Sequence, residues 1–228
     1  MKKMTIVIGV LACLGVIYLT CATGNSKEQP QGFENQMELI VEPGEHWISK
    51  MRIFLFISKN NSPQLAAWIE DSEGNYVSTI AVSEKSAKDK WISAPREGRP
   101  EALPVWSHKQ HNFSVADDLD VVSSATIKGS LEAGIDQNLL INGNTYNVFL
   151  EVNHSFDYNY HWTKDNSGVN GQPSLVYHAQ FVAGQQNSIS LVPIGHGSVD
   201  GSNGNITREL ENLTTALTII HNASIVIK

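Results

Sequence analysis

Two short runs of alternating side chains constrain the fold of this chain more than any other feature. Side chains that repeat at every second residue lie on one face of a β-strand. Residues 145–153 and 175–182 each place four apolar side chains on one face: Tyr146, Val148, Leu150 and Val152, then Leu175, Tyr177, Ala179 and Phe181. The second run is also apolar on its other face, so we expect it in the interior of a sheet.

The segment that joins these two strands, Asn153–Pro173, is rich in aromatic and polar side chains. Its glycines and Pro173 supply the conformations that turns need. Loops held by a rigid sandwich commonly carry the residues that bind other molecules. We therefore expect a binding site in this loop, with the candidate residues His154, Asp157, Tyr158, Tyr160, His161 and Trp162.

Further short runs with strand character are separated by turn residues along most of the chain. They cover residues 37–41, 51–57, 65–70, 76–82, 188–194 and 224–227. This spacing is typical of an all-β fold, an antiparallel β-sandwich. Trp91 and Trp106 are expected to anchor an irregular stretch onto the core. Leu210, Leu213 and Leu217 have helical spacing and predict a short helix near the C-terminus.

The N-terminus has the pattern of an export signal. Lys2 and Lys3 precede an uncharged apolar run over residues 5–19, which is shorter than the ~20 residues that span a bilayer. We interpret residues 1–22 as a signal peptide and residues 23–36 as a polar tether. Residues 37–228 then form a single β-sandwich domain.

The signal peptide can be processed in two ways, which stay open at this point. Cleavage after Ala22 would release a free periplasmic protein, whereas lipidation of Cys21 or Cys13 would make a lipoprotein. These are the chain's only two cysteines, so the mature domain has no disulfide and no cysteine nucleophile.

The charge of the mature domain excludes one class of partner. Loss of Lys2 and Lys3 with the signal changes the net charge from −7 to −9. No basic stripe remains, so we expect no binding to nucleic acid. Contact with a membrane is expected only through a lipid anchor.

Several motifs, in their order along the chain, resemble a bacterial periplasmic family known as domain of unknown function 2271. They are AAWIEDSEGNYVSTIAV, DVVSSAT, YNVFLEVNHSFDYN, SGVNGQPSLVY and LTTALTII. The resemblance implies an immunoglobulin-like sandwich, similar to hook-capping proteins in fold alone, in the periplasm or on the outer surface of a bacterial membrane. It also implies a link to membrane redox or iron-uptake systems, and it carries over no enzymatic activity.

Residues 120–126 resemble the signature Asp-x-x-Ser/Thr-Gly-Ala-Thr of domains that carry covalent FMN. By that match Thr126 would accept the flavin and Asp120 would assist. Ser124 departs from the signature, because glycine there permits a close approach of the backbone to a phosphate. The alternative, which we favour, is a strand that ends in small, closely packed residues.

Three histidines, His154, His161 and His178, are candidate ligands for a transition metal, since imidazole suits such ions. Asp157 or Asp165 could add an oxygen. The spacing matches no known metal motif, so hydrogen-bonded structural histidines are the alternative, above all at His178, which alternates with core residues.

Tyr158, Tyr160 and Trp162 alternate and could form a surface that binds a partner or stacks on a sugar. The alternative is that they close the end of the core.

Neither a G-x-S-x-G elbow nor a phosphate-binding glycine loop occurs in the sequence, so we expect no enzyme. The sequence thus predicts an exported binding or accessory domain with a protein partner in the cell envelope. A periplasmic electron carrier with FMN and a metal-binding protein are the alternatives.

Overall fold

A computed structural model describes residues 37–54, 57–83, 86, 99–112 and 129–227. The predicted signal peptide, the polar tether and Trp91 lie outside these ranges. Asp120 and Thr126, the candidate flavin residues, lie outside them as well.

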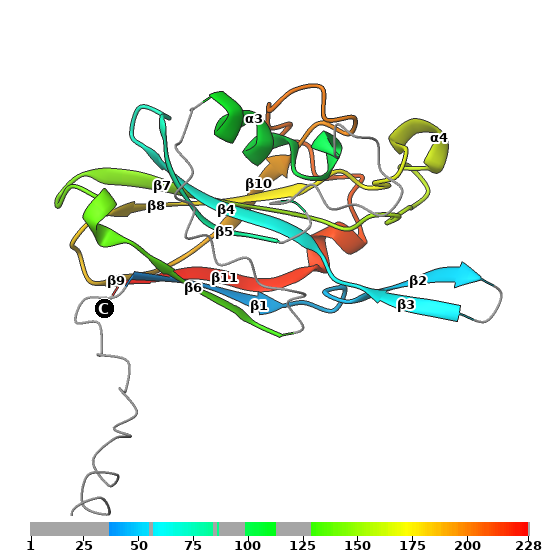
Figure 1. The fold of residues 1–228 in the computed structure, drawn as a ribbon, viewed down its shortest axis with the longest axis horizontal. Coiled ribbons are helices and arrows are strands. Elements are labelled where there is room, and N and C mark those ends of the chain that lie inside the picture. The colour runs from blue at the N-terminus through cyan, green and yellow to red at the C-terminus, as the bar shows by residue number, and fades with distance from the viewer. Residues whose placement is uncertain (1–36, 55–56, 84–85, 87–98, 113–128, 228) are drawn as a thin grey trace, which may run out of the picture. The chain divides into compact units, whose positions relative to one another are not determined.

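The described part of the chain folds mainly into two antiparallel sheets that lie face to face (Figure 1). The four-stranded sheet has the order β6 (Leu131–Ile135), β1 (Met37–Pro43), β11 (Ile220–Ile227) and β9 (Asn187–Ser190). The five-stranded sheet has the order β10 (Val192–His196), β8 (Leu175–Val182), β7 (Thr145–Asn153), β4 (Gln64–Asp71) and β5 (Tyr76–Val82). The predicted all-β sandwich is therefore confirmed.

The core lies between the two sheets, and its faces follow the alternation of the sequence. The four predicted inward residues of β7 are buried, as are those of β8. Leu39 and Val41 of β1 and Ile225 of β11 meet them from the other sheet and are fully buried. Complete burial of such a side chain contributes roughly 2 kcal/mol. The prediction that residues 175–182 lie inside a sheet is confirmed, because β8 lies between β10 and β7.

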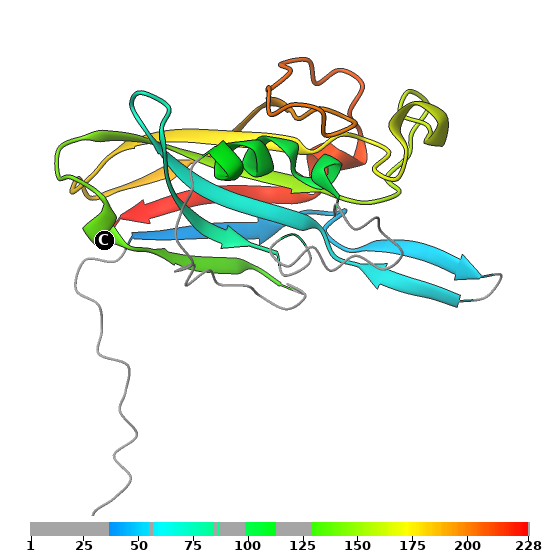
Figure 2. The same ribbon diagram turned by 45° about the horizontal axis from the view of Figure 1, so that its top comes forward.

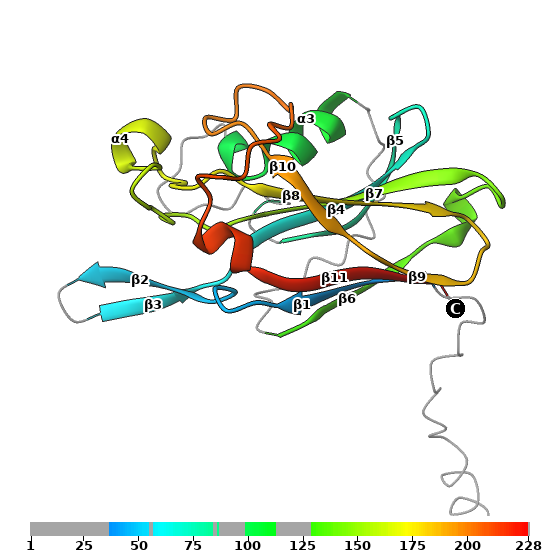
Figure 3. The same ribbon diagram turned by 180° about the vertical axis from the view of Figure 1, so that it is seen from behind.

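Three predicted strands were wrong in extent or position. Residues 51–57 do not form one strand, because the chain makes a separate hairpin of β2 (Ser49–Phe54) and β3 (Ile57–Asn61). The run 188–194 is divided at Leu191, where the chain crosses from β9 in one sheet to β10 in the other (Figure 3). The run 224–227 is the second half of a longer strand, because β11 begins at Ile220 and pairs with β1 on one side and β9 on the other.

A second, smaller apolar cluster covers the outer face of the five-stranded sheet. The turn η1 (Pro100–Ala102) and the helix α3 (Pro104–Asn112) lie over this face (Figure 1). Val105 and Trp106 of α3 pack there with Trp68 of β4, which confirms Trp106 as an anchor. None of the helices in the described ranges is long and apolar enough to cross a bilayer.

The two ends of the sandwich differ. At one end lie the β2–β3 hairpin and the short helix α4 (Lys164–Ser167), with the turn η3 (Thr215–Thr218) nearby (Figure 2). The short helix expected near the C-terminus is this single 3-10 turn. Met37 and Ile227 pair at the opposite end, close to the turn η2 (Gln137–Leu139).

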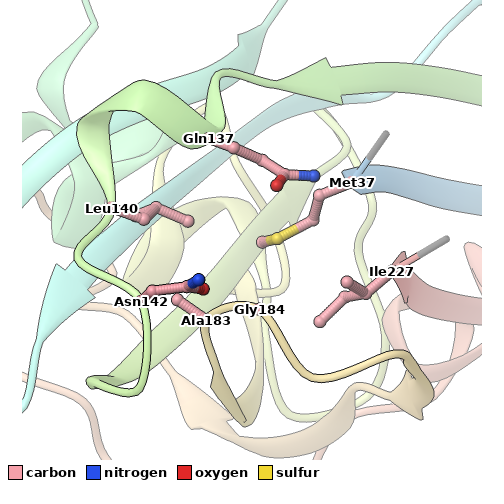
Figure 4. A pocket seen from close by; sticks show the side chains of 7 residues that line it. All are labelled: Met37, Gln137, Leu140, Asn142, Ala183, Gly184 and Ile227. Atoms are coloured by element: carbon pink, nitrogen blue, oxygen red, sulfur yellow. The ribbon is translucent and has the colours of Figure 1, made fainter. Parts of the chain in front are cut away.

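A small cavity lies at that opposite end (Figure 4). Met37, Ile227 and Ala183 line it together with Gln137, Leu140, Asn142 and Gly184. Its volume of about 20 Å³ is room for a single water molecule. We therefore do not regard it as a substrate site.

Candidate functional site

The predicted binding loop leaves the five-stranded sheet at the end of β7 and returns at the start of β8. It carries α4 away from the sheet (Figure 2). Asn166 fixes the start of this helix, because its Oδ1 accepts the backbone N–H of Thr163 at 2.7 Å and its Nδ2 donates to the carbonyl of His161 at 2.8 Å. Such reciprocal bonds stabilise the first turn of a helix.

Asp157, Gln172 and Thr215 tie the base of the loop together. The hydroxyl of Thr215 donates to Asp157 Oδ1 at 2.5 Å, and Gln172 Nε2 donates to Asp157 Oδ2 at 2.8 Å. Gln172 Nε2 also contacts the hydroxyl of Thr215, while its Oε1 accepts the backbone N–H of Thr214 at 2.6 Å. Both carboxylate oxygens of Asp157 are thus engaged in holding the loop.

The backbone of the loop closes on itself at Gly171. The N–H of Phe156 donates to the carbonyl of Val169 at 2.8 Å, and the N–H of Gln172 donates to that of Asp157 at 2.8 Å. Gly171 has a φ of +79°, and a Cβ there would lie 2.4 Å from the carbonyl carbon of Asp157. Only glycine fits this position, because both the dihedral angle and the space exclude a side chain.

Arg99 clamps the loop from the segment that precedes η1. Its guanidinium donates to Ser155 Oγ at 2.6 Å, to Asn170 Oδ1 at 2.7 Å and to Glu101 Oε1 at 2.8 Å. Asn170 donates in turn to the carbonyl of Glu101 at 2.5 Å. Since the Arg99 side chain is only 8% exposed, these bonds are shielded from water and hold the loop more strongly than a surface pair would.

This rigid frame presents four exposed apolar side chains, which are together called the patch: Phe156, Tyr158, Tyr160 and Val169. Tyr160 is 79% exposed and Phe156 is 48% exposed. Phe156 has a φ of +65°, which is rare for a bulky residue and marks a backbone that the surrounding bonds hold in place. The rings of Phe156 and Tyr158 are in edge contact at 6.5 Å.

The two tyrosines of the patch are each held at their hydroxyl. Tyr158 donates to the carbonyl of Gly168 at 2.7 Å, and Tyr160 makes a weak bond of 3.4 Å to Asn212. Partial burial raises the pKa of Tyr158. Trp162 differs from them: it is half-buried against the main core and in edge contact with His196, so it closes the end of the sandwich.

His154 is a structural residue of this end. Its Nε2 donates to the carbonyls of His46 and Trp47 at 3.0 and 3.1 Å, and its Nδ1 lies 3.5 Å from Ser49 Oγ. Burial lowers its pKa, an effect that these carbonyls partly oppose. His154 is therefore neutral at pH 7, and its Nε2 is committed to joining β7 to the segment before β2.

The three candidate metal ligands are not brought together as one site. His161 is exposed in the loop, against the edge of Trp162. His178 lies on the outer face of β8, where it donates to Asn147 and tilts against Phe149. Its pKa is lowered by burial, while the charge of Glu70 opposes this shift. Among the described residues, no group of three His, Cys, Asp or Glu side chains is placed to hold a metal ion.

Two acids of the five-stranded sheet that the sequence did not single out are buried, Glu70 and Glu151, and Glu151 is the more deeply buried. Glu151 is 0% exposed on the outer face of β7, where its oxygens accept the backbone N–H groups of Val105 and Trp106 at 3.2 and 2.9 Å. The hydroxyl of Ser174 donates to it at 2.6 Å. Burial raises the pKa of Glu151 to about 7, although all three donors oppose the shift. Its position between apolar neighbours in the alternating pattern was the available signal.

Residues 49–155 match the model of a family described as "Predicted periplasmic protein (DUF2271)". The resemblance drawn from the motifs is confirmed over that range, whereas the last four residues of YNVFLEVNHSFDYN and the motifs SGVNGQPSLVY and LTTALTII lie beyond it. No curated protein matches the chain significantly, and neither does any solved structure.

Proposed function

Starting from the match of residues 49–155 to a family of predicted periplasmic proteins, we propose that this chain is an exported, non-enzymatic binding module. Its loop Asn153–Pro173 docks on a protein partner in the cell envelope. The family description supports an extracytoplasmic location. The partner that the sequence resemblance favours is a component of a membrane redox or iron-uptake system.

The observation that carries this proposal is an exposed apolar patch on a loop that is already rigid. Tyrosine and other aromatic residues dominate the binding energy of many protein interfaces. Ordering a flexible loop on binding costs free energy, and a loop that is fixed beforehand avoids this cost. Arg99, Asp157 and Gln172 provide that order here.

A protein fits this patch better than a small molecule. Small-molecule sites are usually concave and surround most of their ligand. Tyr160 instead projects with 79% of its surface exposed, and the cavity of Figure 4 lies at the opposite end of the sandwich. A partner with an apolar recess would bury the rings of Phe156 and Tyr160.

Photo-crosslinking from position 160 in the native host identifies the partner, whose affinity is then measured with purified proteins. The double variant Phe156→Asn/Tyr160→Ala should weaken binding by roughly tenfold or more, because it removes two aromatic contacts. Asparagine tolerates the positive φ at position 156, so the loop should keep its shape.

The matched control is Ile141→Ala/Val192→Ala, which removes two apolar side chains that are 67% and 55% exposed away from the loop. It should leave the affinity unchanged. Equal affinities for the patch variant and the control would show that the patch is not the docking surface.

A further inference from the structure

Buried polar atoms without a partner are concentrated at one corner of the sandwich. Among the described residues, six buried side-chain atoms have no hydrogen-bond partner, and four of them belong to three carboxamides. These atoms are Asn61 Nδ2, Gln64 Oε1 and both Oδ1 and Nδ2 of Asn153. Native proteins leave few such atoms, and each one calls for an explanation.

Gln64 and Asn153 lie on one face of the five-stranded sheet. They are direct partners in the pairing of β4 with β7, and each is only 1% exposed. Their neighbours Leu65 and Val152 face the main core, so both amides point to the outer face. Side chains paired in this way have Cβ atoms about 5 Å apart. Asn61, three residues before Gln64, is 8% exposed.

The unpaired atoms define the chemistry of the missing partner. They comprise two donors and two acceptors, all on uncharged carboxamides. A single partner that satisfies both kinds of atom must be able both to donate and to accept hydrogen bonds. Because the amides are almost completely buried, it must also be very small.

We propose that this corner is an internal hydration site, in which bound water bridges the side chains of Gln64 and Asn153 and reaches Asn61. Buried waters typically make about three hydrogen bonds to polar groups that lack other partners. The site lies where Asn153 ends β7 and the binding loop begins. It also adjoins the β2–β3 hairpin, because Ser49 Oγ donates to the carbonyl of Asn61 at 3.5 Å. Water at this corner thus helps to hold the base of the loop in place.

The direct test measures long-lived water in the wild-type protein by NMR. The side-chain amide protons of Asn153 should show cross-relaxation to a long-lived water in the wild type. Gln64→Leu keeps these protons and should weaken their cross-relaxation, and magnetic relaxation dispersion should count fewer internal waters in Gln64→Leu and in Asn153→Leu than in the wild type. A wild-type amide without any contact to water would overturn the proposal.

Thermal unfolding of the two single variants and the double variant provides an independent test. If water satisfies both amides, each single substitution leaves the water without one of its hydrogen-bond partners and lowers the Tm. The decrease in Tm of the double variant should then be smaller than the sum of the two single decreases. If the amides are instead unsatisfied, each leucine raises the Tm additively, and this outcome would also overturn the proposal. Gln180→Leu, at an exposed amide of β8, controls for the change of residue type.

Discussion

Glu151 illustrates how one residue can join two elements. Its carboxyl group accepts two N–H groups at the start of α3, where backbone donors lack partners within the helix. The same group accepts the hydroxyl of Ser174, which precedes β8. A single side chain of β7 therefore fastens α3 to the sheet, at the cost of burying an ionisable group.

We predict that Glu151 makes the protein less stable as the pH rises from about 4.5 to about 7. The pKa of Glu151 is about 7 in the folded protein and 4.5 without burial, so in this range the folded state binds more protons than the unfolded state. The free energy of unfolding should fall by about 3 kcal/mol across this window. Denaturant unfolding of the wild type and Glu151→Gln at a series of pH values measures the difference.

The Gln variant should lack this pH dependence, whatever its absolute stability. Glu132→Gln, on an exposed position of β6, serves as the control and should keep the wild-type slope. Parallel pH profiles for the wild type and Glu151→Gln would show that the carboxyl group of Glu151 does not titrate in this range.

The sequence was sufficient to predict which loop residues are exposed aromatic residues, but not which loop residues anchor the loop to the sandwich. Density of aromatic residues located Tyr158 and Tyr160, which the structure exposes. Asp157 and His154 proved to be anchors, because their partners at Thr215 and at residues 46–47 are distant in sequence. No local pattern reveals such partners, since they depend on how the sheets bring separate segments together.

At the scale of elements, the loop depends on one tight crossing of its backbone. The backbone of Gly171 lies so close to that of Asp157 that a side chain at position 171 would push the two segments of the loop apart. We predict that Gly171→Ala lowers the free energy of unfolding by roughly 2 kcal/mol, since it combines a positive φ with a steric clash. Partner affinity should fall as well, because the patch is built on this crossing.

Gly143→Ala is the matched control. Gly143 has a φ of +83°, but a Cβ there would meet no atom within 4 Å. The variant should therefore carry only the cost of the backbone conformation, about 1 kcal/mol, and should not affect binding. Equal effects of the two alanines on stability would mean that the crossing at Gly171 can relax.

The alternation of apolar and polar residues predicted the strands that stay within one sheet. It did not predict where a strand ends because the chain crosses to the other sheet. Residues 76–82 were predicted with their observed bounds, and residues 65–70 fell one residue short at each end. The break at Leu191 was missed, because a buried leucine continues the apolar pattern while the chain crosses between sheets. α3 was missed because only Val105 and Trp106 among its residues are apolar beyond its first proline, so no helical period is visible.

At the scale of the whole molecule, the binding loop and the start of β1 lie at opposite ends of the sandwich. Met37 shares the cavity of Figure 4 with Ala183 and Gly184, which follow β8, whereas the loop precedes β8. The loop therefore projects from the end of the sandwich opposite to Met37.

The intact mass of the protein from its native host distinguishes the remaining hypotheses for the mature form. We predict either the mass of residues 23–228, which indicates cleavage after Ala22, or an added lipid at Cys21 or Cys13. An added FMN would support attachment at Thr126 and contradict a module without a cofactor. Thr126→Ala is the control, because it should remove an added FMN and leave a lipid in place.

The placement of β1 has a mechanical consequence for an anchored protein. β1 is paired along its whole length with β11 on one side, and from Met37 to Val41 with β6 on the other. A pull on Met37 by a membrane, opposed by a partner that holds the loop, would act along the axis of this strand. The backbone hydrogen bonds that join β1 to β11 and to β6 would then be loaded together in shear, instead of breaking one after another from one end of the strand. The domain could transmit tension between a membrane and its partner without first losing its terminal strand.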